Sequence, residues 1–485
     1  METLFSQDYV FTRLIFQKTL GFIYLVAFLI AALQSRGLMG EHGILPAKLY
    51  LARTTFAENP SLFYFYFSDI AMVALAWIGV ALSILAISGF ADSQGYFLSM
   101  TVWAVLWFLY MSFVNIGQTF YGFGWEILLL EAGFLAIFLG PHSSPVPLLI
   151  IWLYRWLAFR VMFGAGLIKI RGDDCWRDMT CMYYHYETQP LPGPLSWHFH
   201  HLPKVIQRFS VWVNHYVELI APFGLFGPGI IRYIAGISTI LFQLTIFAGG
   251  NYSWLNCISI AICIPCFDDK FLSYFINLPD ITQLPPATWH MVLVCFIFAV
   301  IVLLSYQPAM NLFSKNQAMN RNYDPLNLVN TYGAFGSITR DRYEIIIEGT
   351  SENIVTPTTT WRAYEFKGKP GDPRRWSPQV SPYHFKLDWQ MWFAAMSDYR
   401  YHPWIISFVG KLLQGNPQVL GLLKEDPFHG HPPQFIRAEL YLYKYTDPGE
   451  PGMWKRTKVS EYLPPLTLRD ETFKLLLQSR GWWDQ

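Results

Sequence analysis

Three cations lie inside or at the end of one long apolar stretch of this chain. Arg155 and Arg160 fall within the stretch, and Lys169 follows its last apolar residue. A charge in a membrane-spanning segment is costly and usually faces the bundle interior or a cavity. Glu126 and Glu131, in the preceding apolar stretch, are the expected counter-charges. Two interpretations stay open: ion pairs that fix helix packing, or a polar pocket where acid–base chemistry takes place.

Cysteines form a second group that could do chemistry. Cys175 and Cys181 are followed by four histidines, which suggests zinc or a disulfide: His185, His198, His200 and His201. Five residues separate the two cysteines, whereas zinc pairs usually have roughly two to four between them. We therefore expect no metal site, and either a disulfide or free thiols. Cys263 and Cys266 have the spacing of a redox dithiol, but their apolar surroundings favour two cysteines at a helix end.

Aromatic side chains could form a binding surface for other polypeptides. Trp389, Trp392 and Phe393 share one face of a predicted helix, and Tyr441 and Tyr443 share one face of a predicted strand. Such spacings are typical of core packing, but an exposed aromatic patch would suit partly folded chains. Motifs for nucleotide binding, zinc proteolysis and serine hydrolysis are absent from the sequence.

The composition places these residues in a membrane protein. Of 485 residues, 53% are hydrophobic and only 14% are charged, against about 25% charged in soluble domains. The net charge of +1 gives no reason to expect a nucleic-acid partner. We expect no cofactor, and membrane lipid as the surroundings of the apolar part. Apolar blocks recur as far as residue 306, so we divide the chain into a transmembrane domain, 1–306, and a soluble domain, 307–485.

Seven apolar stretches are expected to span the membrane, since a spanning helix needs roughly 20 apolar residues. They are Leu14–Leu33, Ile70–Phe90, Phe97–Val114, Pro147–Ile168, Val211–Phe226, Ile231–Ala248 and Met291–Leu304. An eighth, Trp125–Leu139, is short and acidic, and is either a short span, a re-entrant helix or a helix buried among the others. Seven spans would put the two chain ends on opposite sides, and eight on the same side. The loop 171–210 is expected on the membrane surface or folded back between helices.

The C-terminal part is predicted to be an α+β domain with a mainly antiparallel sheet. Alternating apolar and polar residues indicate strands at Tyr343–Glu348 and Phe435–Tyr445, with a third expected at Trp361–Lys367. Helical spacing over Trp389–Met396 and Trp404–Leu413 predicts a helical insertion. The expected fold is thus a multi-pass bundle of seven or eight helices followed by this domain.

Several blocks of the sequence resemble the lipase maturation factor family, in family order. In the membrane part they are Gly164–Asp173, Cys175–Asp178 with Cys181, and His185–Pro190. In the C-terminal part they are Asn330–Thr339, Tyr364–Lys367, Lys369–Pro373, Ser381–His384 and Leu387–Trp389. Blocks of this length, rich in glycine and aromatic residues, rarely coincide by chance.

The resemblance implies a membrane-anchored factor that assists folding and assembly of secreted client proteins, dimeric lipases in the animal members. It also implies a C-terminal region that contacts clients, and a location in the endoplasmic reticulum membrane. One departure is a missing cysteine pair: animal members carry it around the block Lys369–Pro373, where this chain has Gly368 and Pro378. This departure fits a bacterial member in a cytoplasmic membrane as well as, or better than, an animal member.

Two rival functions remain. The helical half is also distantly similar to the membrane part of vitamin K-dependent carboxylase-like proteins. That similarity implies an enzyme in which a cavity lined by polar residues acts on a lipid-like substrate, with Lys169, Arg160, Glu126, His185 and Glu187 as candidates. The third function is a thiol-redox folding helper that uses Cys175 and Cys181.

Overall fold

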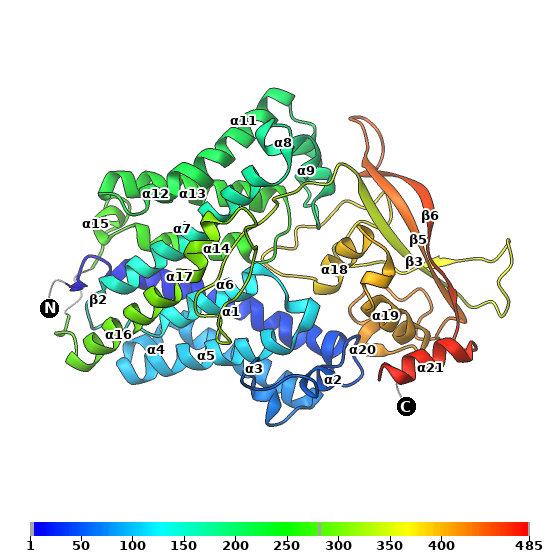
Figure 1. The fold of residues 1–485 in the computed structure, drawn as a ribbon, viewed down its shortest axis with the longest axis horizontal. Coiled ribbons are helices and arrows are strands. Elements are labelled where there is room, and N and C mark those ends of the chain that lie inside the picture. The colour runs from blue at the N-terminus through cyan, green and yellow to red at the C-terminus, as the bar shows by residue number, and fades with distance from the viewer. Residues whose placement is uncertain (1–3, 280–282, 484–485) are drawn as a thin grey trace.

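Six long apolar helices form the frame of the N-terminal part in the computed structural model, which describes residues 4–279 and 283–483 (Figure 1). By length and composition, each of the six can cross a membrane. They are α1 (Val10–Met39), α3 (Asp69–Ser88), α5 (Tyr96–Ile116), α7 (Leu148–Arg171), α13 (Gly229–Gly249), and α16 (Thr288–Leu304) continued by α17 (Tyr306–Phe313).

The bounds of α3 show how the sequence ends such a helix. The Ser68 side chain accepts a hydrogen bond from the Ala71 amide, which satisfies one of the free N–H groups of the first turn. Gly89 follows the last turn with φ +76°, a left-handed conformation that favours glycine. Between these caps, alanines and aliphatic residues fill a helix that exposes apolar side chains such as Ile70. A helix of this kind suits a lipid environment.

Three shorter segments complete the bundle among the described residues. They are α6 (Gly124–Ala136), α14 (Leu255–Cys263) with the 3-10 turn η5 (Ile264–Cys266), and a run made of α11 (Lys204–His215), the π-helical turn η4 (Tyr216–Ile220) and α12 (Ala221–Gly224). The last run contains the stretch predicted as an unbroken span, Val211–Phe226. It is not among the helices apolar enough to cross a membrane, and the π turn interrupts it. The predicted stretch Trp125–Leu139 is α6, a helix buried among the others.

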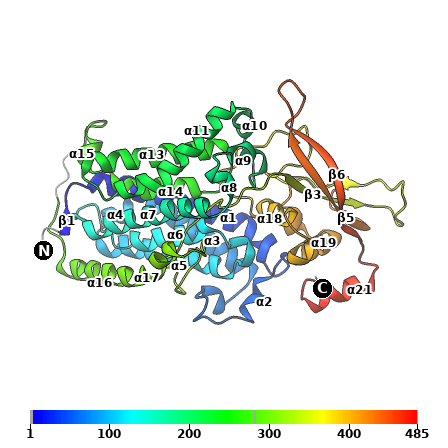
Figure 2. The same cartoon turned by 45° about the horizontal axis from the view of Figure 1, so that its top comes forward.

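The two ends of the chain lie at opposite ends of the bundle (Figures 1 and 2). Near the N-terminus, strand β1 (Phe5–Ser6) pairs with β2 (Val146–Pro147), and Arg13 donates hydrogen bonds to the carbonyls of Leu139, His142 and Ser144. At the other end of α1, Gln34 donates to the His384 carbonyl at 2.7 Å. The C-terminal sheet therefore stands beyond the end of the bundle that is farther from the N-terminus.

The C-terminal region is built on a four-stranded antiparallel sheet in the order β4-β3-β5-β6. Its strands are β3 (Arg342–Thr350), β4 (Arg362–Ala363), β5 (Phe435–Tyr445) and β6 (Trp454–Leu466). In the central pair, Ile345 lies opposite Leu440 and Ile347 opposite Ala438. The helices of this region are α18 (Lys386–Ala395), α19 (Trp404–Leu413), α20 (Pro417–Leu420) and α21 (Glu471–Ser479). α18 packs against β3, and α19 against β5.

The predicted strands and helices of this region are largely confirmed. Both alternating segments are strands, and the two helical patterns are α18 and α19. The third predicted strand, Trp361–Lys367, was too long, because only Arg362 and Ala363 pair with β3. The strand β6 was missed, since its exposed residues include Lys455, Arg456 and Lys458 and so resemble a loop.

The loop 171–210, which was expected on the membrane surface or folded back between helices, joins the bundle to the sheet. It contains the short helices α8 (Asp174–Arg177), α9 (Met182–Thr188) and α10 (Ser196–His200). Trp197 of α10 donates its indole N–H to the Thr446 carbonyl beside β5 at 3.0 Å. The loop is thus part of the contact between the bundle and the C-terminal region.

One apolar core runs through both regions. It extends from α1 and α5 through α6 to Trp389 of α18 and Ile405 of α19. The division of the chain at residues 306 and 307 stays a prediction; this position falls inside α17, and buried residues from both sides of it belong to the same core.

Candidate functional site

A cavity of about 860 Å³ lies where the bundle meets the C-terminal region. Its walls come from α7, the α11–η4 run, α13, α14 and α9, and from the chain segment 332–337 and α18. Most lining side chains are apolar or aromatic, among them Met162, Phe242, Phe335, Trp389 and Phe393. The volume falls within the range of about 300–1,000 Å³ that is usual for small-molecule sites.

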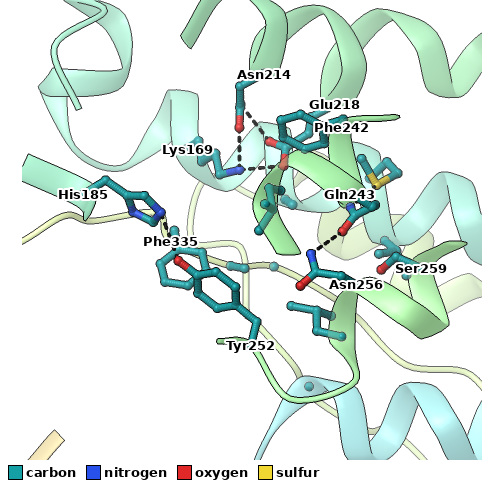
Figure 3. A pocket seen from close by; sticks show the side chains of 18 of the residues that line it. Lys169, His185, Asn214, Glu218, Phe242, Gln243, Tyr252, Asn256, Ser259 and Phe335 are labelled. Atoms are coloured by element: carbon teal, nitrogen blue, oxygen red, sulfur yellow. Dashed lines mark hydrogen bonds and ion pairs between the residues drawn. The ribbon is translucent and has the colours of Figure 1, made fainter. Parts of the chain in front are cut away.

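An ion pair lines one wall of this cavity (Figure 3). The Lys169 Nζ lies 2.5 Å from Oε1 of Glu218 and 2.9 Å from Oδ1 of Asn214. Asn214 in turn donates to the other Glu218 oxygen at 3.0 Å. Each partner is nearly fully buried, so the charges are compensated within the protein.

Two local features of the sequence bring this ion pair together. Glu218 lies in the π-helical turn η4, and single π turns occur frequently at functional sites. Asn214 and Glu218 are four residues apart, so they share one helix face, and both contact Lys169 of α7. Gly166 allows the close approach, because a Cβ atom there would lie 2.8 Å from the Leu219 side chain.

Uncharged polar groups from α13 and α14 also line the cavity (Figure 3). Asn256 donates to the Gln243 side chain at 2.8 Å. The Asn256 Oδ1 and the Ser259 hydroxyl are buried and have no hydrogen-bond partner in the described part of the chain. A buried polar atom without a partner costs about 1–3 kcal/mol, so these two atoms mark places where a ligand group would bind.

His185 and Tyr252 form a third polar group on the cavity wall. The Tyr252 hydroxyl lies 3.0 Å from Nε2 of His185 and donates to Gln189 at 2.5 Å. Burial, helped by the positive charge of Lys169, lowers the pKa of His185 to about 3. The imidazole is therefore neutral at physiological pH and does not add a charge to the cavity.

Arg160 and Glu131 form the ion pair expected from the sequence, but they do not line the cavity. The pair extends into the C-terminal region: Arg160 donates to the Asn330 carbonyl at 2.6 Å, and the Tyr332 hydroxyl donates to Glu131 at 2.7 Å. Arg155, in contrast, donates to the Pro265 carbonyl at 3.1 Å. The contacts of Arg160 and Glu131 hold α6, α7 and the chain around Asn330 together.

Glu126 lies in a separate buried cluster. Lys386 of α18 is 2.6 Å from its Oε1, and the Tyr110 hydroxyl donates to its other oxygen. Burial lowers the pKa of Lys386, and the carboxylate of Glu126 opposes that effect. The expected pairing of Glu126 with a cation of α7 is wrong, because the C-terminal region supplies its partner.

Glu187 joins α9 to the sheet. It accepts a hydrogen bond from the Tyr445 amide at 2.8 Å and lies 3.1 Å from Nζ of Lys444. Of the five residues proposed for an enzymatic cavity, only Lys169 and His185 line the cavity described above. The proposed common site for Lys169, Arg160, Glu126, His185 and Glu187 is therefore wrong in its geometry.

The cysteines lie outside the cavity. Cys175 and Cys181 are joined by a disulfide with Cα atoms 4.8 Å apart. In the part of the chain that the structure describes, no group of three or more His, Cys, Asp or Glu residues could hold a metal ion. Cys263 and Cys266 are buried and unbonded, and burial raises the pKa of the Cys266 thiol to about 11, which makes it a poor nucleophile.

The aromatic candidates are mostly buried. Trp389 and Tyr443 expose 3% and 0% of their surface, so neither belongs to an exposed patch. Trp392 is half-buried, lines the cavity and donates its indole N–H to the Thr188 carbonyl at 2.9 Å. Tyr441 is half-buried beneath the Arg456 guanidinium.

Sequence reasoning missed five polar residues of the cavity. They are the acid Glu218, the amides Asn214, Gln243 and Asn256, and the hydroxyl of Ser259. Glu218 and Asn214 lie in an apolar stretch that was itself predicted to be a span, so the rule that singled out Glu126 would also have found them. The residues of α14 had no such signal, since this short helix was not predicted.

Comparison with known proteins gives the same family as the sequence blocks. A model of the lipase maturation factor transmembrane domain matches residues 11–274, and one of the C-terminal domain matches residues 328–464. Lipase maturation factor 1 from Mus musculus is 41% identical over 97% of this chain and 89% of its own, and the Homo sapiens protein is 40% identical over 97% and 90%. The chain belongs to the lipase maturation factor family.

The family extends to more distant members. Lipase maturation factor 2 from Xenopus laevis is 28% identical over 96% of this chain and 83% of its own. No solved structure matches the chain. Together with the six long apolar helices, the match to the transmembrane domain identifies an integral, multi-pass membrane protein.

Proposed function

We propose that this protein assists the folding and assembly of secreted lipases and does so without catalysing a reaction. The observation that carries the proposal is the match to lipase maturation factors along 97% of the chain, through both the membrane part and the C-terminal part. The scattered positions of the proposed acid–base residues support a non-enzymatic role. Contact with partly folded lipase would shield apolar surface and so suppress aggregation.

The experiment uses cultured cells that lack lipase maturation factor 1. The full chain is expressed in them together with a secreted dimeric lipase, and lipase activity in the medium is measured per amount of secreted lipase. The proposal predicts a rise well above an empty-vector control at equal lipase expression. Activity that stays at the control level while the chain is present in the membrane would refute the proposal.

The edge strand β6 is the surface we assign to client contact. Its inner side pairs with β5, and its outer side has no partner strand in the described ranges, so an extended client segment can add to it. Val459 lies at an irregularity of this pairing and exposes 51% of its surface. We expect Val459→Asp to reduce recovery of the lipase with the full-length protein.

The matched control is Leu475→Asp on α21. Leu475 exposes 60% of its surface in the same region but lies away from the sheet edge. Equal losses of bound lipase in the two variants would argue against β6 as the client surface.

We assign the sheet end of the molecule to the secretory side of the membrane, the lumen of the endoplasmic reticulum. The disulfide Cys175–Cys181 lies at that end, and such bonds persist in oxidising compartments. Basic residues at the same end, including Arg171 and Arg177, favour the opposite orientation under the positive-inside rule. Glycosylation of a site introduced at the sheet end decides between the two orientations.

The substitution Val355→Thr creates a glycosylation site at the exposed Asn353 in a loop of the sheet end. A glycosidase-sensitive shift in mass is expected for this variant in mammalian cells. The natural sequon at Asn251 serves as the unmodified reference, because its side chain is buried and hydrogen-bonded to Pro192 and Pro378. A Val355→Thr protein without a glycan would place the sheet on the cytoplasmic side and exclude contact with secreted clients.

A further inference from the structure

The cavity has an opening between α11 and α13, where residues that line it are also exposed. Leu241 lines the cavity and also exposes 58% of its surface. Thr245, one turn further along α13, likewise lines the cavity and is exposed. Across the opening, Phe209 of α11 lines the cavity and is 60% exposed. Because α13 is one of the helices able to span a membrane, the opening lies within reach of lipid chains.

The walls of the cavity favour a long apolar ligand of limited size. If each non-hydrogen atom of a ligand takes about as much space as a water molecule, roughly 30 Å³, 860 Å³ holds on the order of 30 such atoms. That is enough for a lipid with one chain. It is too little for a complete phospholipid with two chains.

The charges in the cavity favour an uncharged head group. Lys169 and Glu218 neutralise each other at 2.5 Å, and His185 is held neutral by its low pKa. A charged ligand would therefore lose its hydration without gaining a free counter-charge. The Ser259 hydroxyl and the Asn256 oxygen are both buried and without a partner in the described residues. The first can donate to an ester or hydroxyl oxygen, and the second can accept from a hydroxyl group.

We propose that this cavity binds an uncharged, single-chain lipid whose head group accepts a hydrogen bond from the Ser259 hydroxyl and donates one from a hydroxyl to the Asn256 oxygen. The lipid enters between α11 and α13, with its chain against the apolar side chains of α13 and α18. Since Trp389 and Phe393 of α18 line the same cavity, the lipid contacts the bundle and the C-terminal region at once.

Photolabelling of the full-length protein in phosphatidylcholine nanodiscs tests the proposal. The probe is a monoacylglycerol that carries a diazirine in its chain and an alkyne for detection. A diazirine fatty acid of the same chain length is the charged comparison, and a diazirine prenyl alcohol tests a second natural source of an uncharged head. We expect saturable labelling of peptides from α13 and α14 by the monoacylglycerol or the prenyl alcohol, and labelling at background by the fatty acid.

Three variants separate binding from general stability. Ser259→Ala removes the unpaired hydroxyl with little change in volume, so labelling at a subsaturating probe concentration should fall about fivefold while thermal stability stays equal or rises. Thr245→Trp obstructs the opening and should reduce labelling, whereas Leu244→Trp places the same aromatic side chain at an exposed neighbour that does not line the cavity. Equal labelling by the charged probe, or labelling that none of these substitutions changes, would overturn the proposal.

Discussion

The buried pair Glu126–Lys386 joins the membrane bundle to the C-terminal region, and its removal should have a large, specific effect. Both side chains are 0% exposed, and their charged atoms lie 2.6 Å apart. Removal of one partner of such a pair leaves an uncompensated charge and costs about 3–5 kcal/mol. We therefore expect Glu126→Gln and Lys386→Met each to lower the melting temperature clearly.

The double variant decides whether this reasoning holds. With Gln at 126 and Met at 386, neither position carries a charge. The side-chain amide of the new Gln still offers an acceptor to the Tyr110 hydroxyl. The double variant should then be more stable than either single variant, with a coupling free energy of about 3 kcal/mol. Thermal unfolding of the full-length protein in detergent micelles measures the four melting temperatures. Losses that simply add would refute the assigned ion pair.

Three further predictions concern pH and the disulfide. The hydrogen bond from Arg340 lowers the pKa of Asp173 to about 2, so the stability that this pair contributes is present above about pH 4 and is lost as pH falls toward 2. In acid unfolding curves, Asp173→Asn should therefore lose less stability than the parent protein over that pH range. The pKa of His185 is about 3 in the folded protein and about 6.5 in the unfolded chain. The free energy of unfolding should therefore fall by roughly 1.4 kcal/mol per pH unit between about pH 6.5 and pH 3, and this fall should be smaller in His185→Gln. Cys175→Ser with Cys181→Ser should cost about 2 kcal/mol, because the closed loop is short; an unchanged melting temperature under non-reducing conditions would contradict this.

The sequence predicted those elements whose pattern depends on their own residues. The six long apolar helices and the strands β3 and β5 carry their signals locally, as length and apolarity or as alternation. The segments α6 and α14 escaped a clear prediction because protein, rather than lipid, covers much of their surface. The stretch Val211–Phe226 was predicted as one unbroken span because its sequence gives no sign of the π turn η4. A buried helix needs neither the length nor the uniform apolarity of a helix that faces lipid.

The candidate site could be predicted only in part, and for a physical reason. A charge in an apolar stretch signals that it has a partner, as it did for Arg160 and Lys169, but the partner is chosen by tertiary structure. Glu131 lies near Arg160 in sequence and was found, whereas Lys386 is 260 residues from Glu126 and was not. No local pattern records which distant segment brings the counter-charge.

The same contacts explain how a membrane bundle can present a sheet in one fixed orientation. The polar links that cross between the two regions include the buried ion pair of Glu126 with Lys386, and the contacts of Arg160 with Asn330, Asp173 with Arg340, and Glu187 with Lys444. Buried ion pairs add little net stability compared with apolar packing, but they penalise every arrangement in which a charge loses its partner. Apolar packing alone would allow the C-terminal region to shift against the bundle, whereas such a shift would separate these polar partners. The edge of β6 is therefore held at a set position beyond the end of the bundle.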